Sequence, residues 1–483
     1  MNNVIWTMLT LQAVMGFIDI VVHHEFLERL ALRSSARREL QLHGIRNLLY
    51  TLFYLLIAWF EPHGVWAALF IAVLLTELLL TFWDWIAEDA SRSLAPSERV
   101  LHGLLTINYG VLITLLAPLL WSWSQEPTML GAIDHGLWSW LATLFGLVAG
   151  LLGVKDLIAA GRVGAWDARK GSGVELVAEL SEPQALLVTG ATGLIGRRLV
   201  PALLAAGHQV TVLSRRPQRA AQLGLPITII GSLASLADDC EIDGIVHLAG
   251  EPVAAWPWTA ARKRALLVNR TNLVEQVATL AHRLRRKPRV WINASAVGWY
   301  GLGHAAEQAL TERSSAGQGF THELCAAMEN QAINARNGVI RLVNLRIGLV
   351  LSRDAGYLAQ LLIPIDLFCG AVFGRGTQWQ SWVHRDDVVR AIAFCLARPQ
   401  LAGAVNLTAP EPVRLRVLVQ QVAAHLGRRV WIRVPAAWLQ LLPGGMAEEL
   451  LLASQKVLPD KLLHAGFEFR YPQLDGALVQ ELS

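Results

Sequence analysis

The chain has little charge and only a small excess of one sign. Asp, Glu, Lys and Arg make up 17% of its 483 residues, and the formal net charge is +4. This balance argues against a nucleic-acid partner, because nucleic-acid-binding proteins need a concentrated positive surface. Cysteine is also scarce, and all four residues lie beyond residue 239. Their spacing fits neither a disulfide framework nor a metal motif, so we expect reduced cytosolic thiols.

Hydrophobic residues, in contrast, make up 53% of the chain. Their excess lies at the front, in five apolar stretches over residues 4–22, 45–60, 65–86, 100–123 and 137–160. Each approaches or exceeds the roughly 20 residues that a helix needs to cross a bilayer. One cleavable signal peptide would not account for five segments. We therefore expect an all-α transmembrane bundle of about five helices over residues 1–160, with the lipid bilayer as a partner.

Basic residues are unevenly distributed among the connections between these stretches. The second and fourth connections contain no Lys or Arg. The first and third hold Arg29, Arg33, Arg37, Arg38 and Arg46, and Arg92 and Arg99. Because cytoplasmic connections carry the positive excess, the pattern predicts an integral protein of a bacterial inner membrane. Its N-terminus would lie outside, and everything after the fifth segment would be cytoplasmic.

The sequence changes character after residue 160. Glycines interrupt a polar stretch at residues 161–183, which predicts a linker. From residue 184, strands alternate with helices, and strands are expected near 185–189, 209–213, 226–230, 244–248, 289–294 and 339–346. This alternation predicts an α/β fold, a Rossmann doubly wound parallel sheet, over residues 184–429. A small α-rich C-terminal domain is expected over residues 430–483.

The most informative motif is a glycine-rich turn, TGATGLIG, at residues 189–196. It follows an apolar strand and opens an amphipathic helix. In a dinucleotide-binding turn, Gly190 would make the bend, Gly193 would let the backbone approach a pyrophosphate, and Gly196 would let the helix pack on the sheet. The phosphates would then rest on the helix N-terminus, where free N–H groups favour negative charge. The alternative is a turn with a structural role alone.

The end of the second strand indicates which dinucleotide binds. An NAD site usually has a carboxylate there for the ribose 2′-hydroxyl. This chain instead has Arg215 and Arg216, whose guanidinium groups suit a 2′-phosphate. We therefore expect NADP in preference to NAD, although a solvated basic turn would have the same composition.

Several further blocks resemble one family in order along the chain. They are HLAGEP (247–252), WT with RK (258–263), NASAVGWYG (293–301), SWVHRDD (381–387), NLTAPEP (406–412), MAEEL (446–450) and GFEFRYP (466–472). With the glycine turn, they resemble an extended short-chain dehydrogenase/reductase (SDR). More narrowly, they resemble an atypical branch of NAD(P)-dependent sugar-nucleotide epimerases with a short C-terminal domain. The first 160 residues fall outside this resemblance.

The resemblance implies a set of functional residues. Cofactor contacts are expected at Gly190, Thr192, Gly193, Leu194, Ile195, Gly196, Arg215, Arg216, Ala249 and Gly250. Ser295 matches the serine or threonine that polarises a substrate hydroxyl or carbonyl in this superfamily. His247 stands where the family usually has Asn, which is expected to alter a hydrogen bond on the cofactor side.

An ordinary SDR uses a Tyr-x-x-x-Lys pair on one helix face, in which the lysine charge lowers the pKa of the tyrosine. No Tyr-x-x-x-Lys occurs in this chain; Thr321 and Cys325 stand at the two positions. Tyr300 and His322 are candidates for the missing acid–base group, although packing is an alternative for Tyr300. His384 fits a loop-anchoring role better. The identity of the acid stays open.

The apolar part holds a second set of ionisable residues. They are Asp19, His23, His24, Glu25, His43, Arg46, Glu77, Asp84, Glu88, Asp89 and His102. Asp19 and His23 share one helix face. Three explanations are open: snorkelling and interfacial pairing, a pocket for a lipid-like or quinone-like substrate, or a transition-metal site. The first is favoured, and no residue is assigned as a metal ligand.

Together these features predict a membrane-anchored, NADP(H)-binding oxidoreductase or epimerase that acts on the cytoplasmic side. Its small-molecule substrate would be lipid-like or lipid-linked, because tethering raises the effective concentration at the bilayer. The alternative is a non-catalytic nucleotide-binding sensor or a membrane assembly factor, which the missing Tyr–Lys pair favours. The sequence does not determine the oligomeric state.

Overall fold

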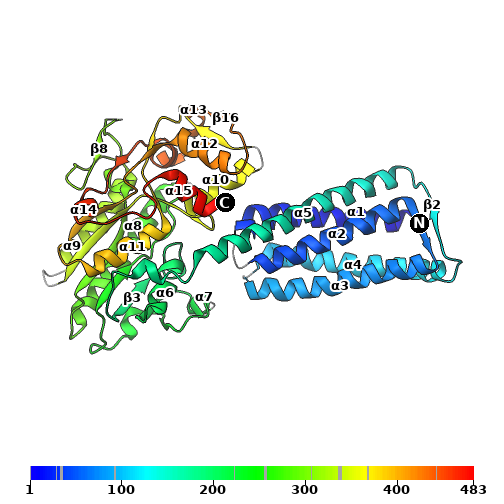
Figure 1. Cartoon of the computed structure of the whole chain (residues 1–483), viewed down its shortest axis with the longest axis horizontal. Helices are drawn as coiled ribbons and strands as arrows, with labels where there is room; N and C mark the ends of the chain where they lie inside the picture. Colours follow the sequence, from blue (N-terminus) through cyan, green and yellow to red (C-terminus); the bar gives the residue numbers. More distant parts are fainter. Residues whose placement is uncertain are drawn as a thin grey trace. The chain divides into compact units, whose positions relative to one another are not determined.

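The computed structural model describes residues 2–28, 30–32, 36–91, 94–221, 223–254, 258–305, 307–335, 340–366, 369–441 and 443–482. The chain divides into two compact units, Met1–Arg169 and Lys170–Ser483. Figure 1 shows the first as a bundle of long helices and the second as a sheet covered by helices. The boundary falls within residues 161–183, where the last helix of the first unit continues to Lys170.

Five long helices form the first unit, as predicted. They are α1 (Asn3–Ile18), α2 (Arg37–Trp59), α3 (Val65–Ser91), α4 (Pro96–Ser124) and α5 (Leu137–Lys170). A π-helix, η1 (Asp19–Leu27), prolongs α1, and a short 3₁₀ turn, η2 (Leu30–Leu32), follows. The connections after α2 and α4 contain β1 (Phe60–His63) and β2 (Met129–Ala132), which pair antiparallel. This pairing brings the two connections that lack Lys and Arg to one end of the bundle.

Four helices of the described chain are long and apolar enough to cross a membrane. They cover Asn3–Glu25, Val65–Asp89, Pro96–Ser124 and Leu137–Gly164. The second predicted stretch is not among them, because α2 begins with the polar run from Arg37 to Arg46. Large apolar side chains cover the outside of the bundle: Leu79, Ile107 and Leu151 are 68%, 68% and 73% exposed. Such a surface is unusual for a protein in water.

A seven-stranded parallel sheet forms the centre of the second unit and confirms the predicted Rossmann fold. Its strands, in sheet order, are β14 (Gly403–Leu407), β9 (Arg341–Ile347), β7 (Val290–Ala296), β6 (Gly244–His247), β3 (Ala185–Thr189), β4 (Gln209–Leu213) and β5 (Thr228–Ile230). The connections leave β3 in one direction and β6 in the other. The order therefore reverses between these strands, which is where open α/β sheets bind ligands.

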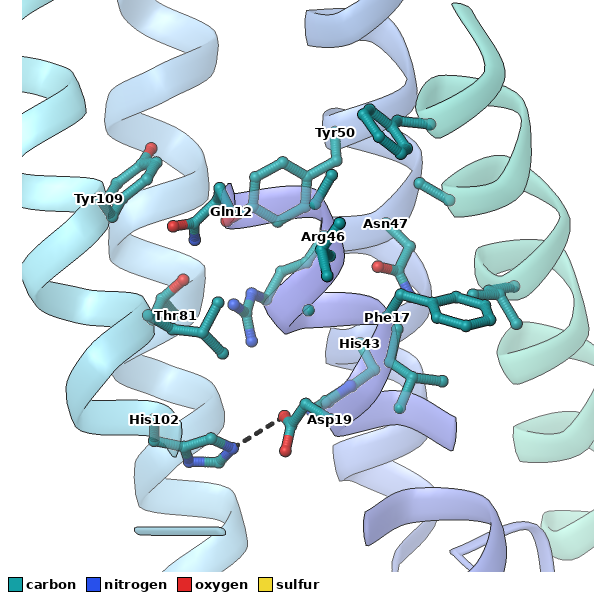
Figure 2. Close-up of a pocket in the computed structure, with 18 of the residues that line it drawn as sticks. Gln12, Phe17, Asp19, His43, Arg46, Asn47, Tyr50, Thr81, His102 and Tyr109 are labelled. Carbon is teal, nitrogen blue, oxygen red and sulfur yellow. Dashed lines mark hydrogen bonds and ion pairs between the residues drawn. The ribbon is translucent and has the colours of Figure 1, made fainter. Parts of the chain in front are cut away.

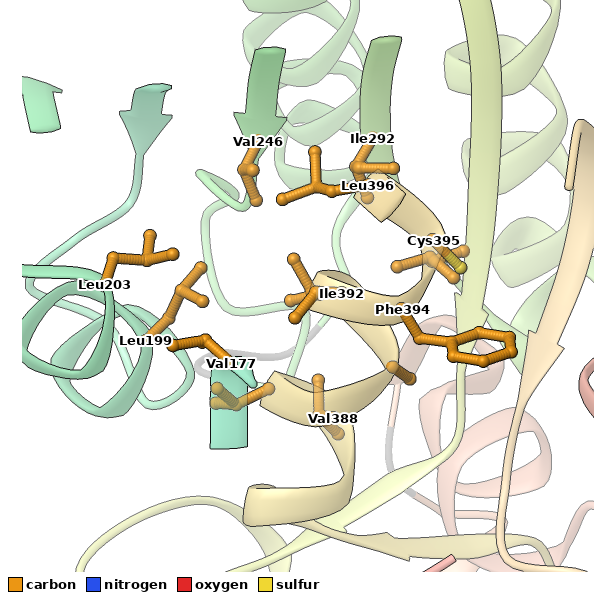
Figure 3. Close-up of a cluster of buried hydrophobic side chains, with 14 of the residues drawn as sticks. Val177, Leu199, Leu203, Val246, Ile292, Val388, Ile392, Phe394, Cys395 and Leu396 are labelled. Carbon is orange, nitrogen blue, oxygen red and sulfur yellow. The ribbon is translucent and has the colours of Figure 1, made fainter. Parts of the chain in front are cut away.

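Helices cover both faces of this sheet. The larger ones are α6 (Gly196–Ala205), α8 (Ala260–Arg283), α9 (Phe320–Ala335) and α11 (Arg385–Ala397). Figure 3 shows Val388 and Ile392 of α11 in a buried cluster with Leu199 of α6 and Ile292 of β7. These β-branched and leucine side chains are wholly removed from water. Their burial fixes α6, and with it the glycine turn, against the sheet.

Shorter elements connect and complete the second unit. Before β9 these are η4 (Val174–Val177), α7 (Pro217–Ala221), η5 (Leu233–Ser235), η6 (Val297–Tyr300) and β8 (Ala309–Leu310). Between β9 and β14 they are β10 (Leu349–Leu351), α10 (Gly356–Asp366), β11 (Ala371–Phe373), β12 (Trp379–Gln380) and β13 (Trp382–His384). After β14 they are β15 (Val413–Arg414), α12 (Leu415–His425), β16 (Ile432–Val434), α13 (Ala436–Leu439), η7 (Pro443–Gly445), η8 (Glu448–Leu452), β17 (Lys456–Val457), α14 (Asp460–His464) and α15 (Leu474–Leu482).

Candidate nucleotide-binding and catalytic site

The glycine turn joins β3 to α6 at the carboxyl end of the sheet. Gly190 has φ of +78°, a conformation that glycine adopts without strain. A Cβ on Gly196 would lie 2.3 Å from the Gly190 carbonyl oxygen, so helix and turn approach too closely for any side chain. A Cβ on Gly193 would meet only the Gly190 oxygen, at 3.2 Å. The turn is thus tightly packed where Gly196 meets Gly190, and it leaves space beside Gly193. A dinucleotide pyrophosphate requires this geometry, because it approaches the backbone at that position.

A second loop approaches this turn from β6. A Cβ on Gly190 would lie 2.8 Å from the Ala249 nitrogen. The Ala249 N–H donates to the Thr189 hydroxyl at 3.1 Å, and that hydroxyl lies 2.8 Å from His247 Nδ1. Burial, together with the charge of Arg270, lowers the pKa of His247 to about 4. His247 is therefore neutral, and it ties the two loops together where the family usually has Asn.

Arg270 of α8 is a partly buried cation that no sequence motif marked. A Cβ on Gly250 would lie 3.2 Å from its guanidinium carbon, and its Nη2 donates to the Glu251 carbonyl at 2.8 Å. Burial lowers the pKa of Arg270 from its ordinary value, which leaves the group charged at neutral pH. In the sequence, Arg270 is recognisable only as a basic residue on the inner face of a predicted helix. The predicted contacts Ala249 and Gly250 therefore adjoin a positive charge.

Arg215 and Arg216 follow β4, the strand beside β3. Both side chains are exposed, and the Arg216 N–H donates to the Ser214 hydroxyl at 3.2 Å, which shapes the turn. The structure places these guanidinium groups at the same edge of the sheet as the glycine turn. No hydrogen bond ties either guanidinium to another part of the described chain.

Ser295 lies near the end of β7 and belongs to a buried polar chain. Its hydroxyl donates to Glu329 Oε1 at 2.7 Å. Arg346 of β9 holds the same carboxylate by two bonds, Nε–Oε1 at 3.0 Å and Nη2–Oε2 at 2.8 Å. The Arg346 guanidinium lies 3.4 Å from the centre of the Trp299 ring. Sequence reasoning identified Ser295 but missed Glu329 and Arg346, because their pairing joins α9 to the sheet.

The two other predicted acid–base candidates lie close to this chain but are bound differently. Tyr300 is fully buried, and its hydroxyl oxygen lies within hydrogen-bond distance of two acceptors, Asn406 Oδ1 at 2.8 Å and Thr311 O at 2.9 Å. Burial raises the pKa of Tyr300. These contacts fit packing better than proton transfer to a substrate. His322 is half-buried and its Nδ1 lies 2.6 Å from the Trp299 carbonyl. That nitrogen must carry a proton, because a carbonyl oxygen only accepts hydrogen bonds.

The two positions of the missing Tyr–Lys pair hold structural contacts. The Thr321 hydroxyl donates to Glu449 Oε2 at 2.7 Å, so a residue of the C-terminal portion caps the start of α9. Cys325 is buried, and burial raises the pKa of its thiol. Neither group supplies a proton donor with a tuned pKa or a cation. His384 also has a structural role, because it caps α11 at Asp386 and its Nε2 lies 3.0 Å from Glu481.

Most of the ionisable residues predicted in the apolar part meet inside the helical bundle. Asp19 Oδ1 and His23 Nδ1 lie 2.8 Å apart, as expected for residues four positions apart on one helix face. Figure 2 shows Asp19, His43, Arg46 and His102 around one cavity. Glu25 instead pairs with Lys155, and Asp89 is exposed. Snorkelling does not describe the group, because Asp19, His24, His43, Glu77, Asp84 and Glu88 are all buried within the bundle.

Known proteins resemble the second unit. Residues 186–407 match the NAD dependent epimerase/dehydratase family, and residues 434–481 match a domain of unknown function, DUF1731. The chain is 36% identical over 300 residues to the chloroplastic SDR39U1 homolog, an epimerase family protein of Arabidopsis thaliana; the match covers 60% of this chain and 84% of that protein. It is 30% identical over 298 residues to the epimerase family protein YfhF of Bacillus subtilis (strain 168), covering 61% and 97%.

Two solved structures share the fold of this unit. Human epimerase family protein SDR39U1 (isoform 2) with NADPH is 29% identical, with a TM-score of 0.56, over 62% of this chain and 99% of that chain. The nucleoside-diphosphate sugar epimerase from Corynebacterium glutamicum is also 29% identical, with a TM-score of 0.51, over 66% and 64% of the two chains. Both family matches begin after the helical unit has ended.

The opening above Gly193 generates a direct test of dinucleotide binding. A valine side chain at position 193 would occupy the space that the pyrophosphate needs, so Gly193→Val should lower NADPH affinity at least ~100-fold, equivalent to about 2.8 kcal/mol. Its Cβ would lie 3.2 Å from the Gly190 carbonyl oxygen, so a small fall in melting temperature should accompany this loss. Gly231→Val is the matched control, since a Cβ there meets only Pro217, at 4.0 Å. Fluorescence titration with NADPH measures both variants. Unchanged affinity in Gly193→Val would show that the turn is structural alone.

Proposed function

Because the chain belongs to the NAD dependent epimerase/dehydratase family, we propose that it is an NADP(H)-dependent oxidoreductase or epimerase anchored in a membrane. The open glycine turn between β3 and α6 carries this proposal. When bound, the nicotinamide cofactor supplies or accepts a hydride at a carbinol or carbonyl carbon. The turn, the N-terminus of α6 and the loop at Ala249 and Gly250 would hold it.

A preference for NADP(H) is supported by charge. Arg215 and Arg216 stand at the end of β4, where an NAD site would have a carboxylate. A guanidinium binds a phosphate by two parallel hydrogen bonds, whereas a 2′-hydroxyl gains little from it. The human relative was solved with NADPH, which is consistent with this choice.

Ser295 is the group best placed to act on the substrate. Ser295 as a residue is 8% exposed, it lies at the carboxyl end of the sheet, and its hydroxyl is oriented by the bond to Glu329. With its own proton donated to Glu329, Ser295 presents an oxygen lone pair that accepts a bond from a substrate hydroxyl. Arg346 holds Glu329 in place through two bonds, so that it acts as a positioning residue.

Membrane anchoring is supported by the apolar outside of the helical bundle and by four helices of sufficient length. The pairing of β1 with β2 puts the two connections without Lys or Arg at one end. This agrees with an outer N-terminus and a cytoplasmic second unit. A lipid-like or lipid-linked substrate follows from the anchor, because tethering concentrates the enzyme at the bilayer.

A non-catalytic nucleotide sensor is the second candidate function. It is supported by Thr321, which is bound to Glu449 at the position where the superfamily has its catalytic tyrosine.

Cofactor preference is tested by reversing one charge. The wild type should bind NADPH at least ~10-fold more tightly than NADH, or about 1.4 kcal/mol, and Arg215→Asp should remove this preference. Arg429→Asp, an exposed arginine elsewhere in the second unit, is the control and should leave the preference intact. Calorimetric titration of full-length protein in detergent measures the affinities. Equal wild-type affinities for both cofactors would contradict the assignment.

Catalysis is tested at Ser295. A screen of lipid and metabolite extracts that follows NADPH absorbance would first identify turnover. Ser295→Ala should then lower kcat on the order of 100-fold and leave NADPH binding intact, the usual loss for one electrostatic or proton-transfer group. Cys325→Ala should retain most of the activity. The opposite pattern would indicate thiol chemistry, and NADPH binding with no turnover of any extract would favour the sensor.

Topology is tested by cysteine labelling in intact cells. Arg37→Cys should be shielded from an impermeant maleimide added outside, whereas Gln125→Cys should react, because both positions are exposed at opposite ends of the bundle. The native exposed Cys369 of the second unit is the internal marker and should react only after permeabilisation. Strong external labelling at position 37 would overturn the proposed orientation.

A further inference from the structure

Seven side chains inside the helical bundle form two adjoining groups of potential metal ligands. One group is Asp19, His24, Glu98 and His102, and the other is His24, Glu39, His43 and Glu88. Within each group, one ligand atom per residue lies within 4.8 Å of all the others. Six of the seven residues are buried, and His102 is nearly so. The donors come from η1, α2, α3 and α4, the facing-helix arrangement in which bundles build metal sites.

The π-helix η1 brings Asp19 and His24 to the same site. In a regular α-helix, residues five apart point about 140° away from each other. The wider turn of a π-helix, with its i→i+5 bonding, brings them closer to the same side of the helix, and such segments frequently occur at functional sites. Here His24 Nε2 lies 3.7 Å from Asp19 Oδ2 and 3.7 Å from Glu98 Oε1. The departure from α-helical geometry therefore completes the first group.

Glu88 joins the two groups. Its Oε1 lies 3.6 Å from His43 Nε2 in one group, and its Oε2 lies 3.6 Å from His102 Nδ1 in the other. These separations exceed hydrogen-bond lengths. They approach the roughly 3.0–3.5 Å between two ligands of a common ion with bonds of about 2.1 Å. A carboxylate with one oxygen toward each group is in the position of a bridging ligand.

A cavity of about 350 Å³ reaches this cluster from inside the bundle. Asp19, His43, Glu88 and His102 all contribute to its wall, together with apolar residues of α1, α3 and α5. Figure 2 labels Asp19, His43 and His102 among these residues. Asp84 Oδ1, on the same helix face as Glu88, is buried and makes no hydrogen bond within the described chain. Because four of the potential ligands line the cavity, a small molecule in the cavity could reach them.

We propose that these seven residues bind two divalent first-row transition-metal ions, bridged by Glu88. One ion takes Asp19, Glu98 and His102, the other takes Glu39 and His43, and His24 completes one of the two shells. Imidazole and carboxylate together suit Fe²⁺, Mn²⁺, Co²⁺ and Zn²⁺, and the absence of thiolate disfavours Cu⁺. Two ions that share a carboxylate lie about 3.5–4 Å apart in proteins. The site extends what the sequence indicated, since no single motif joined these residues.

The test measures metal bound to the full-length protein in detergent. Metal analysis after growth with added iron, manganese and zinc should find close to two ions per chain. After chelation, Co²⁺ titration should restore two equivalents, with visible absorption bands from the bound ion. Glu88→Gln keeps the shape but removes the bridging charge, so it should weaken Co²⁺ binding at least ~10-fold or reduce it to one equivalent.

His63→Gln is the matched control. His63 is a buried histidine that also faces a carboxylate, Glu126 at 2.8 Å, but it belongs to β1, outside both groups. Its variant should bind two Co²⁺ ions like the wild type. A single ion in the wild type would overturn the bridged pair. No metal in the wild type, or equal binding by Glu88→Gln and wild type of equal helix content, would overturn the site and leave a histidine–carboxylate ion-pair network.

Discussion

The close approach of the Gly190 carbonyl to the backbone of Gly196 organises the second unit of this protein. Because no Cβ fits between them, α6 starts directly against the end of β3 and lies flat on the sheet. Its buried leucines then pack on α11, and the loops after β3 and β6 meet at Thr189 and His247. A wider turn would move the N-terminus of α6 away from the switch point of the sheet. The geometry of the turn thus depends on a close backbone approach and on no side-chain contact at Gly190 or Gly196.

The polar contacts beside this turn differ from those of an ordinary short-chain dehydrogenase/reductase. Where the superfamily places tyrosine and lysine, Thr321 and Cys325 serve packing and capping. A different polar chain, Ser295–Glu329–Arg346, joins α9 to two strands beneath the expected substrate position. A buried carboxylate needs a partner, and the two-bond contact with Arg346 supplies it. This chain gives Ser295 one fixed orientation and explains how an SDR fold without the usual pair retains an ordered serine.

In the helical unit, apolar side chains lie on the outside and ionisable side chains lie inside. Its outer surface is apolar, yet its interior holds carboxylates and imidazoles away from water. Buried charges of this kind must be paired, hydrogen-bonded or bound to metal. Part of the pairing is direct, as in His43–Asp84 at 2.8 Å and Asp19–His102 at 3.0 Å. His24 of this group lies on the π-helix η1, together with Asp19.

The sequence by itself determined the elements and the fold class. Strand periodicity located six strands of the parallel sheet, and the glycine spacing located the cofactor turn, because both depend on neighbours along the chain. Apolar length likewise identified the helical unit, although α2 proved too polar at its start to meet the criterion for a membrane-crossing helix. Only the tertiary structure decided which polar residues meet. Glu329 reaches Ser295 across 34 positions, and His24 joins His43 and Glu88 only because a π-helix turns it inward. Such contacts join distant segments, and no local pattern in the chain encodes them.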